Sequence, residues 1–488
     1  MDRKWVVFVV VVFGVFVSVV DNSATVVALP TLAQLFGTDL PTVQWVTVGN
    51  GLTIAALLVP MGRLGDLIGR KLVYLIGFAT FVAGSLVAWS ATSIEMLILA
   101  RVVTGVGAAA AQGNSVAILA NAFESRERGR VLGMQMGVVG VGAIVGPALG
   151  GWVIGTLGWR QVFLGVAVAG IAVLICAQAV LRRRKVRPVE QALRFDWLGA
   201  ALSAMFLVAF LVSLSSGARV GWSSPHLWAG LALASVLLVL FIWRERVAAE
   251  PMLDLRLFAI PIVAMGVLGT LTTFMGLAAM RYLVPFHVQS VLALDATATG
   301  LVLVPAAIVT AIASPITGGL SDRLGARRFA HLGLAVCVVG LIALGLVGPT
   351  SSVTFVIIAM MVTSFGAAAF HAPNTSSVIN AVPREHYGVV SGFTNLARNA
   401  GNVVGIALAT AAVSVVMAGA GFAPTLDPAA VPAAEEARAA VVASFDGGAR
   451  AAFWLLAAIV CAVLVCSLRF ARDPVSTEDA EPPAASAS

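Results

Sequence analysis

Apolar stretches of roughly 20 residues recur along the chain, separated by short polar segments that carry most of the charges. Each stretch has the length of an α-helix that crosses the hydrocarbon core of a bilayer. The stretches are continuous rather than alternating, which favours helices over the strands of a membrane barrel. The pattern therefore predicts an all-α polytopic membrane protein with fourteen spans, at residues 5–28, 43–62, 72–91, 96–120, 131–155, 160–181, 197–215, 226–243, 262–288, 297–318, 329–347, 353–380, 388–418 and 451–470.

The basic residues orient these spans. With the N-terminus in the cytoplasm, 23 of the 30 lysines and arginines fall in inward loops and tails, four in outward loops and three within spans. Such an excess is typical of cytoplasmic loops, so we expect both termini in the cytoplasm. The apolar run after Arg3 and Lys4 lacks a convincing cleavage site and is expected to remain as the first span.

Composition excludes several classes of function. Only 11% of the residues are charged and the mean hydropathy is +0.99, values typical of a chain solvated by lipid. The net charge of +7 sits in short clusters without interleaved aromatic residues, so it does not indicate a nucleic-acid partner. The four cysteines lie inside apolar spans without metal-site spacing, and no nucleophile–base set or P-loop stands out. We expect no cofactor, no metal and no enzymatic activity.

The spans group into two halves. We expect an N-terminal six-helix bundle over residues 1–185, a basic linker with two additional central helices over 186–255 and a C-terminal six-helix bundle over 256–471. The polar, acidic tail 472–488 is expected to be disordered. The loop "GRLGDLIGRK" follows the second span, and "GGLSDRLGARR" follows the second span of the last six. Such an internal repeat places a substrate site between the halves.

The first of these loops is short and rich in glycine and charged residues. Its glycines allow a tight turn, and Asp66 and Arg70 stand four residues apart. One interpretation is a latch that forms when the cytoplasmic side is closed; the other is a solvated, charged turn. The partial copy in the second half favours the latch. Its members are Gly62, Gly65, Asp66, Gly69, Arg70 and Lys71.

The fifth span is rich in glycine. Its small-xxx-small spacings allow two helix backbones to approach closely, and Pro147 invites a kink. Packing alone explains such spacings, but the compact Gly-Pro-x-x-Gly-Gly form is more specific. The residues concerned are Gly142, Gly146, Pro147, Gly150 and Gly151.

Two opposite charges lie inside the first and fourth spans. Asp21 is the single carboxylate that the predicted spans place within the body of a helix, and Arg101 lies in "LARVVTGVGAA". Charged groups inside a membrane face the bundle and find a partner, and they mark functional sites. Alternatively, Asp21 is a structural hydrogen-bond acceptor or faces an outer vestibule, and Arg101 binds carbonyl groups of a neighbouring helix.

Together these motifs resemble the major facilitator superfamily, specifically its fourteen-helix drug:proton antiporter branch. "VVDNSATVVALP" resembles the first-helix signature of the branch, although Val26 replaces its usual asparagine. "GRLGDLIGRK", "LARVVTGVGAA" and "GVVGVGAIVGPALGG" resemble the loop between helices two and three, the fourth-helix arginine motif and the antiporter motif. "PREHYGVVSGFTNLARNAGNVVGIAL" is similar to helix thirteen, so the resemblance covers nearly the whole chain.

The resemblance implies alternating access, in which two bundles rock about a central cavity and protons enter in exchange for an exported lipophilic compound. Asp21 and Arg101 are then the proton-coupling pair. Arg281 is expected to contact an anionic substrate or to gate the outer side; the alternative is a snorkelling or structurally paired arginine. The candidate cavity residues are Asn22, Thr25, Arg281, His371 and Asn374.

The expected function is export of drugs or antibiotics across the cell membrane by a monomer. Its partners are protons, a small-molecule substrate and the lipid bilayer. The alternative is a dedicated exporter of one natural product or anionic metabolite that uses the same machinery. A sensor built on a transporter scaffold is a third class, disfavoured by the intact coupling motifs.

Overall fold

The computed structural model describes residues 3–123, 125–181, 196–220, 224–248, 255–382, 387–423 and 435–469, and every regular element in these ranges is helical. In chain order the elements are α1 (Arg3–Phe36), α2 (Leu40–Val43), α3 (Trp45–Ile68), α4 (Arg70–Trp89), α5 (Ile94–Ala122), α6 (Ser125–Leu157), α7 (Arg160–Val180), α9 (Trp197–Val220), α10 (Pro225–Val247), η1 (Leu255–Ala259), α11 (Pro261–Phe286), η2 (His287–Val291), α12 (Ala296–Leu324), α13 (Ala326–Leu344), α14 (Val353–Asn380), α15 (Tyr387–Gly419) and α16 (Glu435–Arg469).

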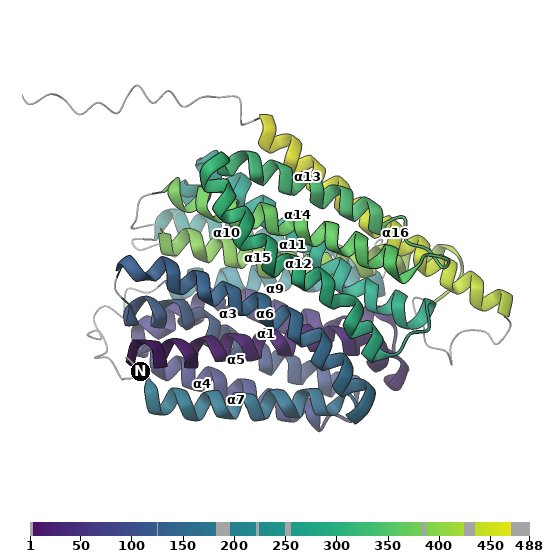
Figure 1. Ribbon diagram of the computed structural model, residues 1–488, viewed down its shortest axis with the longest axis horizontal. Helices are drawn as coiled ribbons and strands as arrows, with labels where there is room; N and C mark the ends of the chain where they lie inside the picture. Colours follow the sequence, from purple (N-terminus) through teal and green to yellow (C-terminus); the bar gives the residue numbers. More distant parts are fainter. Residues whose placement is uncertain are drawn as a thin grey trace, which may run out of the picture.

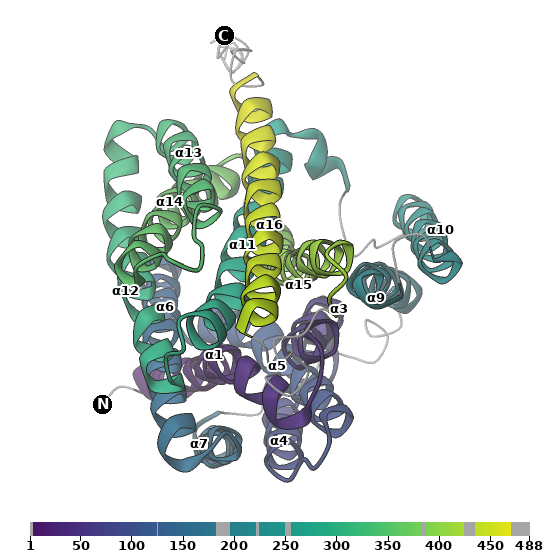
Figure 2. The same ribbon diagram turned by 90° about the vertical axis from the view of Figure 1, so that its right-hand side faces the viewer.

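The long helices form two groups. Helices α1 and α3–α7 pack on one another in one half of the molecule, and helices α11–α16 pack in the other half (Figure 1). The two groups meet mainly where α6 packs on α12, α3 on α15 and α1 on α11. The view in Figure 2 shows α1, α3, α11 and α15 at the centre, where the halves face each other.

The remaining pair, α9 and α10, lies at the side of the molecule (Figure 2). The two helices pack on each other, and α9 also packs on α3 and α15. Asp196, just before α9, accepts a 2.9 Å hydrogen bond from Nε of Arg244 in α10 and also accepts one from the backbone N–H of Gly199. This ion pair ties the two helices together at one end.

Among the described residues, twelve helices are long and apolar enough to cross a membrane. The helices α3 and α9 are 24 residues long but are not among these twelve. The polytopic all-α architecture is therefore confirmed, while the count of fourteen spans stays a prediction. The predicted tail 472–488 and most of the linker lie outside the described residues.

Two predicted boundaries were wrong. The helix that contains the first span continues from Arg3 to Phe36, so Asp21 lies near its middle instead of near its end. The last helix begins at Glu435, within a segment that had been predicted as a long outward loop. The Ala-rich sequence after Glu435 has high helix propensity, whereas the predicted spans depend on long apolar stretches alone.

The internal repeat is visible in backbone geometry. Gly69 joins α3 to α4 with φ 105° and ψ 121°, and Gly325 joins α12 to α13 with φ 99° and ψ 115°. Residues with a side chain rarely adopt such angles, so both turns require glycine. The same turn thus stands at the same place in each half.

Direct hydrogen bonds between side chains of one half and groups of the other gather at one end of the described molecule. Tyr282 donates to the carbonyl of Leu40 at 3.2 Å, and Gln289 donates to the carbonyl of Val27 at 3.2 Å. Thr31 and Gln289 are joined at 3.4 Å, and Thr297 donates to the carbonyl of Gly151 at 3.3 Å. These contacts lie where α1 and α11 end, which is the outward side in the predicted orientation.

Candidate functional site

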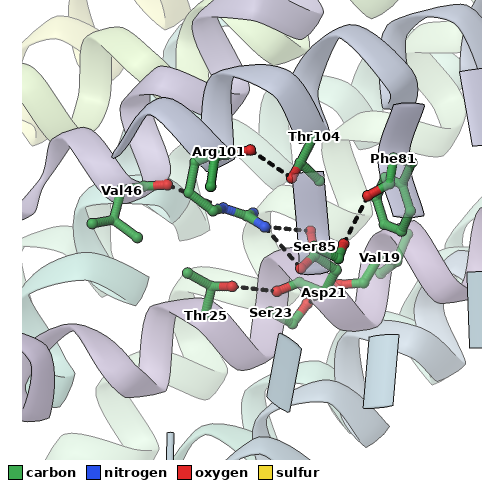
Figure 3. Close-up of polar contacts among 10 residues, drawn as sticks. Val19, Asp21, Ser23, Thr25, Val46, Phe81, Ser85, Arg101 and Thr104 are labelled. Carbon is green, nitrogen blue, oxygen red and sulfur yellow. Dashed lines mark hydrogen bonds and ion pairs between the residues drawn. The ribbon is translucent and has the colours of Figure 1, made fainter. Parts of the chain in front are cut away.

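The structure brings Asp21 and Arg101 into direct contact (Figure 3). Nη1 of Arg101 in α5 lies 2.8 Å and 2.9 Å from the two carboxylate oxygens of Asp21 in α1. The Arg101 side chain is 0% exposed and the Asp21 side chain is 1% exposed. Charged groups in such surroundings require a partner, and here each is the partner of the other.

Arg101 also links two further helices. Its Nε donates to the carbonyl of Val46 in α3 at 3.3 Å, and its guanidinium carbon lies 5.8 Å from the centre of the Phe163 ring in α7. Nη2 of Arg101 has no hydrogen-bond partner among the described residues. The guanidinium therefore holds four helices of one bundle together, yet one of its two terminal nitrogens is unsatisfied. Such a group stays capable of forming a new contact.

The polar residues next to Asp21 differ in their surroundings. Thr25 is fully buried and donates to the carbonyl of Asp21 at 2.7 Å, whereas Asn22 is partly exposed. Thr25 therefore packs inside the bundle in this conformation and does not line an open cavity, contrary to its placement among the cavity candidates. Asn22 stays available.

The glycine motif of α6 lies along the same stretch of α1. A methyl group at Gly146 would lie 2.6 Å from Cβ of Ser23, and one at Gly150 would lie 2.7 Å from Cβ of Ala24. Gly142 faces Val19 in the same way, at 3.0 Å. The backbones of α6 and α1 thus approach directly beside Asp21, which larger side chains would prevent.

The end of this motif faces the other half. A methyl group at Gly151 would lie 2.5 Å from the carbonyl oxygen of Ala296 in α12, and Gly300 faces the carbonyl of Pro147. Thr297 also donates to the carbonyl of Gly151. One face of α6 therefore packs on α1, and its neighbouring face makes a close contact between the two bundles.

The loop between α3 and α4 packs inside its own half. Gly62 lies against the carbonyl of Gly113, and Gly65 leaves no room for a Cβ beside the Asn114 side chain, both in α5. Arg70 donates to the carbonyl of Ala117 at 3.0 Å.

Lys71 donates to the carbonyls of Gln178 and Leu181 at the end of α7. The loop is therefore fixed on one bundle from both ends. The expected contact between the side chains of Asp66 and Arg70 lies outside the described residues, as does the side chain of Asp322 in the second copy.

The C-terminal half contains the other predicted cavity residues. Arg281 in α11 donates from Nη2 to Oδ1 of Asn402 in α15 at 2.9 Å. His371 in α14 packs edge-to-face on Phe274, with ring centres 5.1 Å apart. Asn374 donates to the carbonyl of Gly266 and to Thr270, so it joins α14 to α11.

Sequence reasoning missed a second buried acid. Nδ1 of His287 lies 2.9 Å from Oδ1 of Asp446, and both side chains are buried. Asp446 falls between two predicted spans but lies inside α16, so the prediction of Asp21 as the single carboxylate within the body of a helix was wrong. A histidine inside an apolar run was the available signal.

Two bundles related by a repeated turn, with a buried ion pair beside their contact, define a membrane transporter. The sequence profile of the Major Facilitator Superfamily matches residues 11–406, and this chain belongs to that family. The fold is also similar to a crystal structure of a bacterial homolog of the human lysosomal transporter Spinster, at a TM-score of 0.71 and 16% identity, covering 98% of this chain and 99% of that one.

Named relatives cover most of the chain. The multidrug resistance protein Stp of Mycobacterium tuberculosis is 32% identical over 81% of this chain and 73% of its own length. The riboflavin transporter RibZ of Clostridioides difficile is 28% identical over 83% and 88%, and the lincomycin resistance protein LmrB of Listeria monocytogenes is 27% identical over 93% and 94%.

Proposed function

We propose that this chain is a proton-coupled antiporter of the cell membrane that exports lipophilic small molecules, drugs and antibiotics among them. The observation that carries the proposal is the buried pair of Asp21 and Arg101. Two relatives are named for multidrug and lincomycin resistance, which supports export, and another is named for riboflavin transport. We place the chain in the fourteen-helix drug:proton branch on its first-helix, fifth-helix and loop motifs.

Proton coupling follows from the chemistry of the pair. A buried carboxylate paired with a guanidinium holds its negative charge more readily than an unpaired one, because protonation removes the charge that the guanidinium binds. A movement that separates Asp21 from Arg101 leaves the carboxylate buried and unpaired, and a proton then neutralises it.

The bundle contacts couple this step to alternating access. In the predicted orientation the hydrogen bonds between the halves lie at the outward end, which supports an arrangement closed to the outside. Opening outward requires α6 to separate from α12 while the glycine contacts keep it on α1. Because α1 carries Asp21, a shift of α6 and α1 as one unit changes the surroundings of the carboxylate. The loop of Gly62–Lys71 then acts as the latch on the inward side.

The remaining assignments complete the proposal. Protons are the coupling ion, no cofactor takes part, and both termini lie in the cytoplasm. Each bundle has its own packed interior, and the pair of Asp21 and Arg101 lies within a single chain. This supports a monomer as the working unit.

The experiment that tests the proposal is export in everted vesicles with Asp21→Asn. The substitution keeps size and hydrogen bonding but cannot bind and release a proton. We expect the variant to insert in the membrane and to lose transport driven by a pH gradient, while Glu95→Gln, the same change at an exposed acid in the first turn of α5, keeps it. Unchanged pH-driven export by Asp21→Asn would remove the carboxylate from the mechanism.

A further inference from the structure

Among the described residues, two arginines inside the C-terminal half have no acidic partner. The ion pairs among the described residues join Arg101 to Asp21, Arg244 to Asp196 and His287 to Asp446. Arg281 and Arg398 take part in none of them within that part of the chain. An arginine inside a membrane faces the protein interior and pairs with a counter-charge, or it marks a path for an ion or substrate.

The two arginines share one region. Arg281 binds Asn402, which stands four residues after Arg398 and therefore on the same face of α15. The charge of Arg398 lies close enough to act on both Arg281 and His371. Two positive groups thus repel each other, and the one hydrogen-bonding partner of Arg281 in the described residues, an amide, cannot neutralise them.

This region faces the other half of the molecule. Asn402 lies at the middle of α15, and the next residue, Val403, lies 3.1 Å from a methyl group built at Gly51 in α3 of the N-terminal half. The hydrogen bond to Asn402 directs Arg281 toward this central position and away from the membrane surface, which rules out snorkelling. Arg281, Arg398 and His371 are all partly exposed, so the surrounding side chains do not enclose them completely.

We infer that Arg281 and Arg398 form a binding site for the anionic group of the exported substrate, a carboxylate or a sulfonate on a lipophilic body. The planar guanidinium matches a carboxylate in shape and charge. Phe274 and His371 place two rings, packed edge-to-face, beside this site, which suits an aromatic body. This inference rests on the proposed export function and specifies its substrate class.

The test is equilibrium binding of two dyes of one skeleton to the purified full-length protein in detergent. Fluorescein carries negative charge and rhodamine 6G carries positive charge, and fluorescence anisotropy follows both. We expect the wild type to bind fluorescein in preference to rhodamine 6G. The double variant Arg281→Gln/Arg398→Gln should weaken fluorescein binding about tenfold or more and leave rhodamine 6G binding unchanged or tighter.

Three controls keep the result specific. Arg398→Lys keeps the positive charge but loses the planar guanidinium, so it should weaken fluorescein binding less than Arg398→Gln does. Arg450→Gln removes an exposed positive charge and should have no effect. Asp21→Asn should bind fluorescein normally, because binding at equilibrium needs no proton gradient, so failure of proton coupling and failure of the anion site are separate results. Equal fluorescein binding by wild type and double variant, preference for rhodamine 6G, or no saturable fluorescein binding would overturn the inference.

Discussion

The arginines inside the two halves of the molecule have opposite surroundings. In the N-terminal half, Arg101 is neutralised by Asp21, which it contacts at 2.8 Å and 2.9 Å. In the C-terminal half, Arg281 has an amide as its hydrogen-bonding partner and lies near a second positive charge. A neutralised pair is suited to exchange a proton, whereas an uncompensated charge is suited to attract an anion. Under the proposed function, this contrast places coupling in one half and substrate recognition in the other.

The largest expected effect is the loss of Arg101. Arg101→Gln leaves Asp21 buried without its counter-charge, and breaking a buried pair in this way destabilises a protein by about 3–5 kcal/mol. The melting temperature of the purified protein should fall steeply. The double variant Asp21→Asn/Arg101→Gln should recover much of that stability without recovering pH-driven transport. A single variant as stable as the wild type would contradict the account of the pair.

A smaller loss is expected where α6 meets α1. Gly146→Val places side-chain atoms against Ser23, where even a Cβ would lie at 2.6 Å, and overpacking of this kind costs about 1–3 kcal/mol. We expect lower thermal stability and a faster proton leak in vesicles. Gly137→Ala in the same helix is the matched control, since no atom of a neighbouring helix lies within 4 Å of its Cβ position. Equal behaviour of the two variants would show that the close contact is unimportant.

The repeated turns provide a comparison between corresponding positions. Gly69→Ala and Gly325→Ala should each destabilise the protein by about 1–3 kcal/mol, because both glycines hold a backbone conformation that alanine adopts only with strain. Thermal unfolding of both variants measures this effect. A large loss at one turn and none at the other would argue against their structural equivalence.

The smallest expected effect has the opposite sign. Arg398→Gln removes a positive charge that has no acidic partner in the described part of the chain and that repels Arg281. Its melting temperature should stay level or rise slightly, in contrast to that of Arg101→Gln. A loss comparable to that of Arg101→Gln would reveal a counter-charge that the comparison between the halves does not include.

Much of this arrangement could be predicted from the sequence. Long apolar runs predict membrane helices by length alone, and the repeated loops predict two related halves. Asp21 and Arg101 were recognised as a pair because charges inside apolar helices need partners. These inferences succeed because they depend on the chemistry of single residues or on local patterns.

Other features depend on tertiary structure. The contact between Arg281 and Asn402 joins positions 121 residues apart, and that between His287 and Asp446 joins positions 159 residues apart. Nothing local in the sequence specifies such pairs. Asp446 was also hidden by a wrong helix boundary, because Ala-rich and polar residues before the apolar run extend α16. The burial of Thr25 could not be predicted from the sequence either, because it depends on how α1 packs among its neighbours.

The most direct test of the central claim compares two modes of transport by the same protein in proteoliposomes. One mode is exchange of labelled for unlabelled substrate without a pH gradient, and the other is accumulation driven by an imposed gradient. The account predicts that Asp21→Asn retains exchange, because substrate binding and bundle movement do not need the proton, and loses gradient-driven accumulation. Accumulation at the wild-type level in Asp21→Asn would contradict the assignment of Asp21 as the proton-binding group.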